Sequence, residues 1–354
     1  GEEASERALQ MALELGDDYI MARAWGRRAL ALLGVDGRDA EIERANLEAA
    51  RLAEAAGDLD TLYIVLNNIG VLHSKGSDQQ RSRQLLERKL DVAGRLGSPW
   101  ALAVALDDLG EHCYERGDLA GWRSFREEAL LVARRTGLVA VSYELAVPGE
   151  ILLVEGKSAE ARAHFERCVD DGRRPGAGPL SDVALSWLAE LDRLEGKLAQ
   201  ARGRLEAFLQ KPDVDLEMCY PRLVPLMLTL LEMRSDEADR AARGLLEEVG
   251  STGLSQYSIV SLARINIASG WLAARDGNRM EAMRFLDESL DTLRSRQFIV
   301  GEGEVLVHYG LILDELGETV AASERFAAAA ELFRRIGHIP HARRAELFLA
   351  RASI

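Results

Sequence analysis

The chain has 354 residues, of which 47% are hydrophobic and 29% charged, and its formal net charge is −14 at pH 7. The apolar share is large enough to fill a core, which excludes a disordered chain, and the negative charge disfavours direct binding to nucleic acid. No apolar run reaches the roughly 18 residues of a membrane-spanning helix, and an odd number of widely spaced cysteines predicts reduced thiols and a cytoplasmic location.

Helix is expected along nearly the whole chain, because Ala, Leu, Arg and Glu dominate and only 8 prolines interrupt it. Residues 2–16 are expected to form a single helix and residues 17–56 the first helical hairpin. Further hairpins are expected at 58–97, 98–137, 138–172, 178–211, 215–250, 255–297 and 298–337. A single helix over 340–353 ends the array. We therefore expect one solenoid domain over residues 1–354, which begins and ends in the middle of a repeat and is a piece of a longer protein.

Small residues recur with a period of about 40 residues, which indicates stacked helical hairpins. A small residue in the first helix lets the two helices of a hairpin approach closely, while a larger side chain from a neighbour fills the space. This column contains Gly70, Gly110, Gly149, Ala189, Gly270 and Gly310. Glycine at a helix end provides a left-handed terminator. Two further columns supply such terminators: Gly117, Gly156, Gly196, Gly277 and Gly317, and Gly16, Gly57, Gly97 and Gly137.

Two segments interrupt this regularity. Residues 172–179 contain two prolines and three glycines, so a surface loop and a looser joint are expected there. Pro221 and Pro225 fall in the first helix of the sixth pair, where we expect a kink or a late start near Pro221.

The first helices carry the pattern L-x-x-I/L-G-x-x-H/C, as in Leu66-Ile69-Gly70-His73 and Leu106-Leu109-Gly110-Cys113. The second helices supply Leu90-Ala93, Leu130-Ala133 and Ala330-Phe333. These residues resemble the tetratricopeptide repeat (TPR), although each unit is about six residues longer than the standard repeat and mostly lacks its terminal proline. The longer unit is similar to the arrays of bacterial ATP-dependent transcription regulators of the maltose-activator type, and of bacterial peptide-pheromone receptors. The resemblance implies an all-α, right-handed superhelix of about eight helix pairs plus single terminal helices, with ATPase and DNA-binding parts elsewhere.

The resemblance also implies that the first helix of each pair lines the concave face. Three consecutive repeats place a carboxylate on that face, at Glu111, Glu150 and Glu190. This column is either a solvated acidic face or a stripe that binds a cationic peptide or an amine. Arg193, Arg234 and Arg264 fall on inner positions farther along, so the groove is expected to become more basic toward the C-terminus.

The candidate ligand-binding residues of the concave face combine these charges with amide and aromatic side chains. Asn67 can donate and accept hydrogen bonds with an extended peptide, or it is a common residue of this repeat class without a binding role. The tyrosines lie one turn from the acidic column, and the tryptophan is either a groove or a core residue. The full set is Asn67, Asp107, Glu111, Tyr114, Tyr143, Glu150, Glu190, Arg193 and Trp271.

The sequence predicts no catalytic residues, cofactor or metal. The segment 149–158 has six residues between its glycines, whereas a phosphate-binding loop needs four. His338 and His341 flank Ile339-Pro340 and are interpreted as surface histidines at a turn, since zinc-binding pairs share a helical face. Cys113 occupies a motif position and is interpreted as a core residue.

The leading interpretation is a non-enzymatic module of a cytoplasmic bacterial signalling or transcription-regulatory protein. Its partner is a protein or peptide, or a small effector, held on the concave face; no membrane or nucleic acid is expected, and self-association is left open. The alternatives are a structural scaffold for protein assembly and an enzyme with its site in the lumen of the superhelix. Strongly perturbed pKa values in the groove would favour the enzyme.

Overall fold

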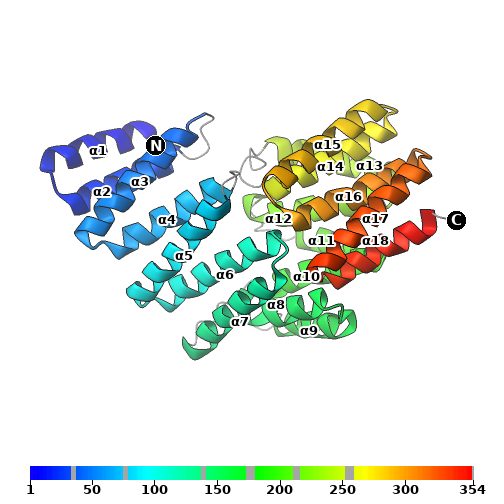
Figure 1. Cartoon of the computed structure of the whole chain (residues 1–354), viewed down its shortest axis with the longest axis horizontal. Helices are drawn as coiled ribbons and strands as arrows, with labels where there is room; N and C mark the ends of the chain where they lie inside the picture. Colours follow the sequence, from blue (N-terminus) through cyan, green and yellow to red (C-terminus); the bar gives the residue numbers. More distant parts are fainter. Residues whose placement is uncertain are drawn as a thin grey trace. The chain divides into compact units, whose positions relative to one another are not determined.

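The computed structural model describes residues 1–32, 37–74, 79–136, 141–172, 180–209, 216–251 and 259–352. Within these ranges the protein is all-α, with eighteen helices and no strand (Figure 1). Its contacts divide the chain into two compact units. Unit 1 comprises Gly1–His112 and Leu131–Leu138, and unit 2 comprises Cys113–Leu130 and Val139–Ile354.

Unit 1 contains the N-terminal helices, and each of the first four packs against the next along the chain. Its core is built from small and aliphatic side chains such as Ala49, Leu62, Leu66 and Val92. The helices are α1 (Glu2–Leu15), α2 (Asp18–Leu32), α3 (Asp39–Ala56), α4 (Leu59–Ser74), α5 (Gln79–Leu96) and most of α6 (Pro99–Glu115).

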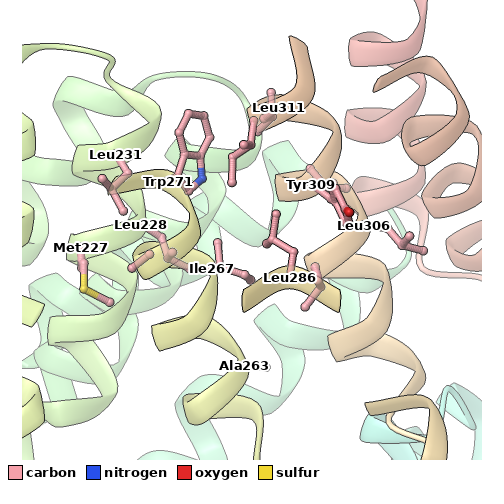
Figure 2. Close-up of a cluster of buried hydrophobic side chains, with 14 of the residues drawn as sticks. Met227, Leu228, Leu231, Ala263, Ile267, Trp271, Leu286, Leu306, Tyr309 and Leu311 are labelled. Carbon is pink, nitrogen blue, oxygen red and sulfur yellow. The ribbon is translucent and has the colours of Figure 1, made fainter. Parts of the chain in front are cut away.

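Unit 2 contains the remaining helices, and α7 (Leu119–Thr136) contributes residues to both units. Figure 2 shows part of its hydrophobic core, where Trp271 and Ile267 of α14 lie among Leu231 of α12 and Leu311 of α16. The helices are α8 (Val141–Val154), α9 (Ser158–Gly172), α10 (Leu180–Leu194), α11 (Leu198–Leu209), α12 (Leu216–Glu232), α13 (Asp236–Ser251), α14 (Ile259–Arg275), α15 (Arg279–Ser295), α16 (Ile299–Glu315), α17 (Thr319–Ile336) and α18 (Ile339–Ala352).

The helices of the described residues form consecutive pairs, from α2 with α3 to α16 with α17, and leave α1 and α18 as single terminal helices. This confirms the predicted all-α array of tandem helical hairpins, a TPR-like solenoid. The hand of the superhelix and its continuity as one domain stay predictions. Among the described residues, no helix is long and apolar enough to cross a membrane.

The small column brings the two helices of a hairpin together, as predicted. A Cβ atom added at Gly149 or Gly310 would lie 2.5 Å from the ring of Phe165 or Phe326. The corresponding distance from Gly270 to Leu286 is 3.3 Å, so a methyl group would meet its neighbour there as well. In each case the partner follows sixteen residues later, on the second helix of the same pair.

The glycines at the helix ends are terminators, as predicted. Gly117, Gly156 and Gly277 have φ angles of 73°, 74° and 77°, in the left-handed region that glycine favours. Two helix ends without glycine still adopt this conformation: Gln297, one period before Gly337, has φ 57°, and Arg234, which follows α12 close to the expected position, has φ 54°. The repeat therefore imposes the turn even where the side chain opposes it. Gly137 lies outside the described residues.

Helix α12 differs from the sequence expectation. It begins at Leu216, five residues before Pro221, so the expected late start is wrong. The helix continues past Pro225 because its following residues, including Leu226 and Leu230, are packed in the core of unit 2 and hold it there. The predicted loop at 172–179 falls outside the described residues except for Gly172, which ends α9.

Candidate functional site

The first helices of the pairs in unit 2, together with the single terminal helix α18, form a closed ring. Helices α8, α10, α12, α14, α16 and α18 contact one another in that order, and α18 in turn contacts both α8 and α10 (Figure 1). A close approach marks the closure: a Cβ on Gly156, which follows α8, would lie 2.5 Å from Ile339, the first residue of α18. The inner face of these helices is therefore enclosed.

Arg193 of α10 is the centre of an ionic network on that inner face. Its Nε and Nη2 donate to the two carboxylate oxygens of Glu190 at 2.8 Å each, and its Nη1 donates to Glu232 of α12 at 2.9 Å. The Arg193 side chain is only 5% exposed. Burial opposes its charge, but the adjacent carboxylates outweigh burial and raise the pKa of Arg193 well above its usual value.

The network continues around the ring. Glu232 also accepts a hydrogen bond from Arg344 of α18, and Glu304 of α16 accepts one from Arg264 of α14 at 2.9 Å. Burial would raise the pKa of both carboxyl groups, but the neighbouring guanidinium groups lower it to about 2. Together with Arg193 and Glu190, three arginines face three glutamates, so the network is balanced in charge at neutral pH.

His308 of α16 lies beside this network with no exposed surface. Trp271 donates its indole N–H to His308 Nδ1 at 3.1 Å, which places the proton of the neutral ring on Nε2. That Nε2 is 3.6 Å from Glu232 Oε1 and has no hydrogen-bond partner in the described part of the chain. Burial lowers the pKa of His308 to about 4, although Glu232 acts in the opposite direction. The ring is therefore neutral at pH 7.

His338 and His341 are not surface histidines, and that interpretation is corrected. His338 precedes α18 and is 1% exposed, because it packs where the ring closes. Its Nε2 lies 3.1 Å from the hydroxyl of Tyr114, and its Nδ1 lies 3.1 Å from Nδ1 of His341. Burial lowers the pKa of His338 well below its usual value and that of His341 to about 3. One proton shared between the two Nδ1 atoms satisfies this contact.

A pocket of about 360 Å³ opens onto the network. Its wall comes from the ends of α10, α12, α14, α16 and α18 with parts of α11 and α17, so it belongs to the inner face of unit 2. It combines four guanidinium groups, three carboxylates and three aromatic rings with aliphatic side chains. The lining residues are Arg193, Leu194, Glu195, Gly196, Leu198, Glu232, Arg234, Trp271, Leu311, Asp314, Phe326, Arg344, Leu347, Phe348, Arg351 and Ala352.

Three of the predicted site residues lie in unit 1. The side-chain oxygen of Asn67 accepts a hydrogen bond from the buried Lys89 at 2.7 Å, so part of this amide is engaged within the unit. Asp107 is half-buried on α6, and Glu111 is exposed on the same helix. Their role in binding stays a prediction.

The other predicted residues lie in unit 2, and only Arg193 and Trp271 line the pocket. Glu150 is buried and pairs with Arg126, and Glu190 is held by Arg193, so neither offers an unpaired carboxylate. Tyr114 contacts His338 at the closure of the ring. The side chain of Tyr143 lies outside the described residues. A ligand-binding role for these residues stays a prediction.

Sequence reasoning missed four residues of the site: Glu232, Glu304, His308 and Arg344. A signal was present for Glu304 and His308, because both lie in the largely apolar stretch 303–313 of α16, where polar residues are rarely buried without a partner. Glu232 ends the apolar stretch 223–232 of α12, which is a weaker signal of the same kind. Arg344 had no comparable signal, since α18 carries arginines on several faces.

No family model matches the chain, and no curated protein matches its sequence. Among solved structures, a monomeric mutant of IFIT1 with m7Gppp-AAAA is 14% identical with a TM-score of 0.35, over 82% of this chain and 68% of that one. The TPR domain of P58(IPK) is 16% identical with a TM-score of 0.25, over 99% and 97%. A circular tandem repeat protein is 18% identical with a TM-score of 0.18, over 99% and 88%. Similarities this low do not assign a family or a function. The consecutive helix pairs and their repeat define the chain as a TPR-like helical-repeat protein.

Proposed function

We propose that the chain is a non-enzymatic binding module that holds a small effector, or a short segment of a partner protein, on the inner face of its first helices. The observation that supports this most is the pocket of about 360 Å³ at the inner ends of these helices. Its volume falls in the lower part of the range of small-molecule sites, and its mixture of apolar walls with a few charged groups is typical of them. The resemblance of the repeat adds the wider context, a cytoplasmic bacterial signalling or transcription-regulatory protein.

An enzyme in the lumen is the second candidate, because buried groups with shifted pKa values lie beside the pocket. The direction of the shifts argues against it. Glu232 and Glu304 have pKa values of about 2, so they stay ionised at neutral pH, whereas a general acid or base works best with a pKa near the working pH. His308 is fully buried and does not line the pocket. A structural role for these groups, in holding the wall of the pocket rigid, therefore fits better than a catalytic role.

The test is thermal unfolding of the full chain with a panel of small carboxylates, phosphates, amines, sugars and tripeptides. A ligand with a Kd of about 1 mM, added at about 10 mM, contributes roughly 1.4 kcal/mol and raises the Tm of a unit of this size by about 3–5 °C. Ala352→Trp fills the pocket from the last turn of α18, and Ala350→Trp adds the same side chain at an exposed position that does not line it.

We expect at least one compound to raise the Tm of the wild type and of the Ala350→Trp variant, and to lose its effect in the Ala352→Trp variant. A panel without any effect, or an effect that survives Ala352→Trp, would contradict binding in this pocket.

A further inference from the structure

The carboxylates that line the pocket are already neutralised. Glu232 is paired with Arg193 and Arg344, and Asp314 lies 3.7 Å from Arg234. Glu195 is paired with Arg162 at 2.9 Å and with Lys197 at 2.7 Å. Each negative group of the wall therefore has a cation of the protein beside it, and the wall has no free carboxylate to offer a cationic ligand.

The guanidinium groups of the wall are not all neutralised. Arg344 is 6% exposed and donates only from Nη2, to Glu232, which leaves its Nε and Nη1 without an acceptor among the described residues. Arg351 lines the same pocket and forms no ion pair within the described part of the chain. Arg234 is 43% exposed, and its contacts to Asp314 at 3.7 Å and to Glu315 at 3.4 Å leave much of its guanidinium open to solvent. The wall itself carries four guanidinium groups against three carboxylates, so its charge is positive, although the chain as a whole carries −14.

Apolar surface lies next to these donors. The guanidinium of Arg344 stacks over the ring of Phe348 at 5.3 Å, and Trp271 forms part of the same wall. Leu347 is 48% exposed although it lines the pocket, so a ligand could cover apolar surface that now faces solvent. Anionic groups bind guanidinium through charge-assisted hydrogen bonds, and the adjoining rings favour an apolar or aromatic body.

From these contacts we infer that the pocket takes a small organic anion, a carboxylate or phosphate attached to an apolar or aromatic body, whose charged group meets Arg344, Arg351 and Arg234. This inference rests on the proposed function and names the ligand class of the same site. The acidic column led us to expect a cationic ligand, whereas the pocket favours an anionic one, because the glutamates of that column in unit 2 are paired with arginines.

The experiment compares four probes of nearly equal size with the full chain by calorimetry: phenylacetate, phenyl phosphate, phenylacetamide and phenethylamine. We expect either or both anions to bind, and the neutral amide and the amine to bind at least about tenfold more weakly, since hydrogen bonds between charged groups are the strong ones. Binding of the anion should weaken as salt is added.

Three variants locate the charged group. Arg351→Gln and Arg234→Gln change exposed side chains, and Arg344→Lys keeps a cation for Glu232 while removing the planar group with its free donors. Each should weaken binding of the anion, with about a tenfold loss for Arg344→Lys. The control is Arg240→Gln, which removes the same charge from an exposed position of α13 outside the pocket and should leave the affinity within about twofold.

The outcomes separate the inference from the proposed function. Equal binding of the amide or the amine, or equal affinities in the pocket variants and in Arg240→Gln, overturns the anionic ligand. If such a probe is also lost in Ala352→Trp, the pocket is still a binding site and only its ligand class is wrong. If none of the four probes binds, the inference falls, and the wider panel decides the proposed function.

Discussion

Lowering the pH from 7 to 5 is expected to destabilise unit 2, because folded unit 2 buries His308 and His341 in their neutral forms. His308 is enclosed by groups from every neighbouring first helix: Trp271 of α14, Glu232 of α12, Arg193 of α10, Arg344 of α18 and Glu304 of its own helix. Burial is the largest cause of its lowered pKa, with a further contribution from Arg193. His308 therefore binds a proton more weakly in the folded state than in the unfolded chain.

The magnitude follows from linkage. The ordinary pKa of histidine is 6.5 and that of folded His308 is about 4, so its contribution to stability is complete above 6.5 and is lost as the pH falls toward 4. At pH 5 the loss is about 2 kcal/mol for His308, and a similar value applies to His341 with its pKa of about 3. Glu232 and Glu304 do not contribute in this window, because stability from a carboxylate with a pKa of about 2 is lost only below its ordinary value of 4.5.

The assay is urea unfolding of the full chain at pH 7 and pH 5, followed by circular dichroism, for the wild type and for His308→Gln. Glutamine can still accept the hydrogen bond from Trp271 but does not titrate. The variant is expected to lose about 2 kcal/mol less than the wild type between the two pH values, whatever its stability at pH 7. If both proteins lose the same free energy with equal m-values, His308 is not held neutral by burial and the reasoning fails.

Three further substitutions, two of them with a control substitution, test the fold and the network. Gly310→Ala should cost about 1–3 kcal/mol in urea unfolding, because its Cβ would lie 2.5 Å from an aromatic ring, whereas Gly244→Ala, which meets nothing within 4 Å on its helix, should stabilise by about 0.5–1 kcal/mol. Gln297→Gly should raise the Tm slightly, since release from the left-handed conformation outweighs the added freedom of the unfolded chain by roughly 0.5 kcal/mol, and a lower Tm would contradict this. Glu232→Gln should cost about 3–5 kcal/mol by leaving buried arginines without their partner, whereas Glu331→Gln, which breaks an exposed pair, should change stability by less than about 1 kcal/mol, and equal effects would refute the buried network.

The helix pairs could be predicted from sequence because the same glycine and apolar positions recur in each repeat. A single Gly310 would be weak support for a close approach, but Gly149 and Gly270 occupy the same place in their own hairpins and meet side chains in the same way. Gln297 shows the strength of the period, since the turn is found at the expected position even without glycine. The long helix α12 could not be predicted from its prolines, because burial of its later residues holds a helix that local propensity opposes.

The ionic network was predictable only where it follows the repeat. Arg193 reaches Glu232 and Arg264 reaches Glu304 across 39 and 40 residues, one period of the array, so both contacts join equivalent positions of neighbouring pairs. The contacts that close the ring have no such relation: Arg344 with Glu232, Arg343 with Gly156 and Tyr114 with His338 span 112, 187 and 224 residues.

Whether a row of hairpins closes depends on small rotations that add up over many pairs, and no single repeat encodes that sum. The repeat unit therefore specifies the contacts between neighbouring helix pairs, whereas the closure of the ring specifies which residues of α18 join them. The histidines flanking the start of α18 could be interpreted as surface residues for this reason, because their burial is created by helices far away in the sequence.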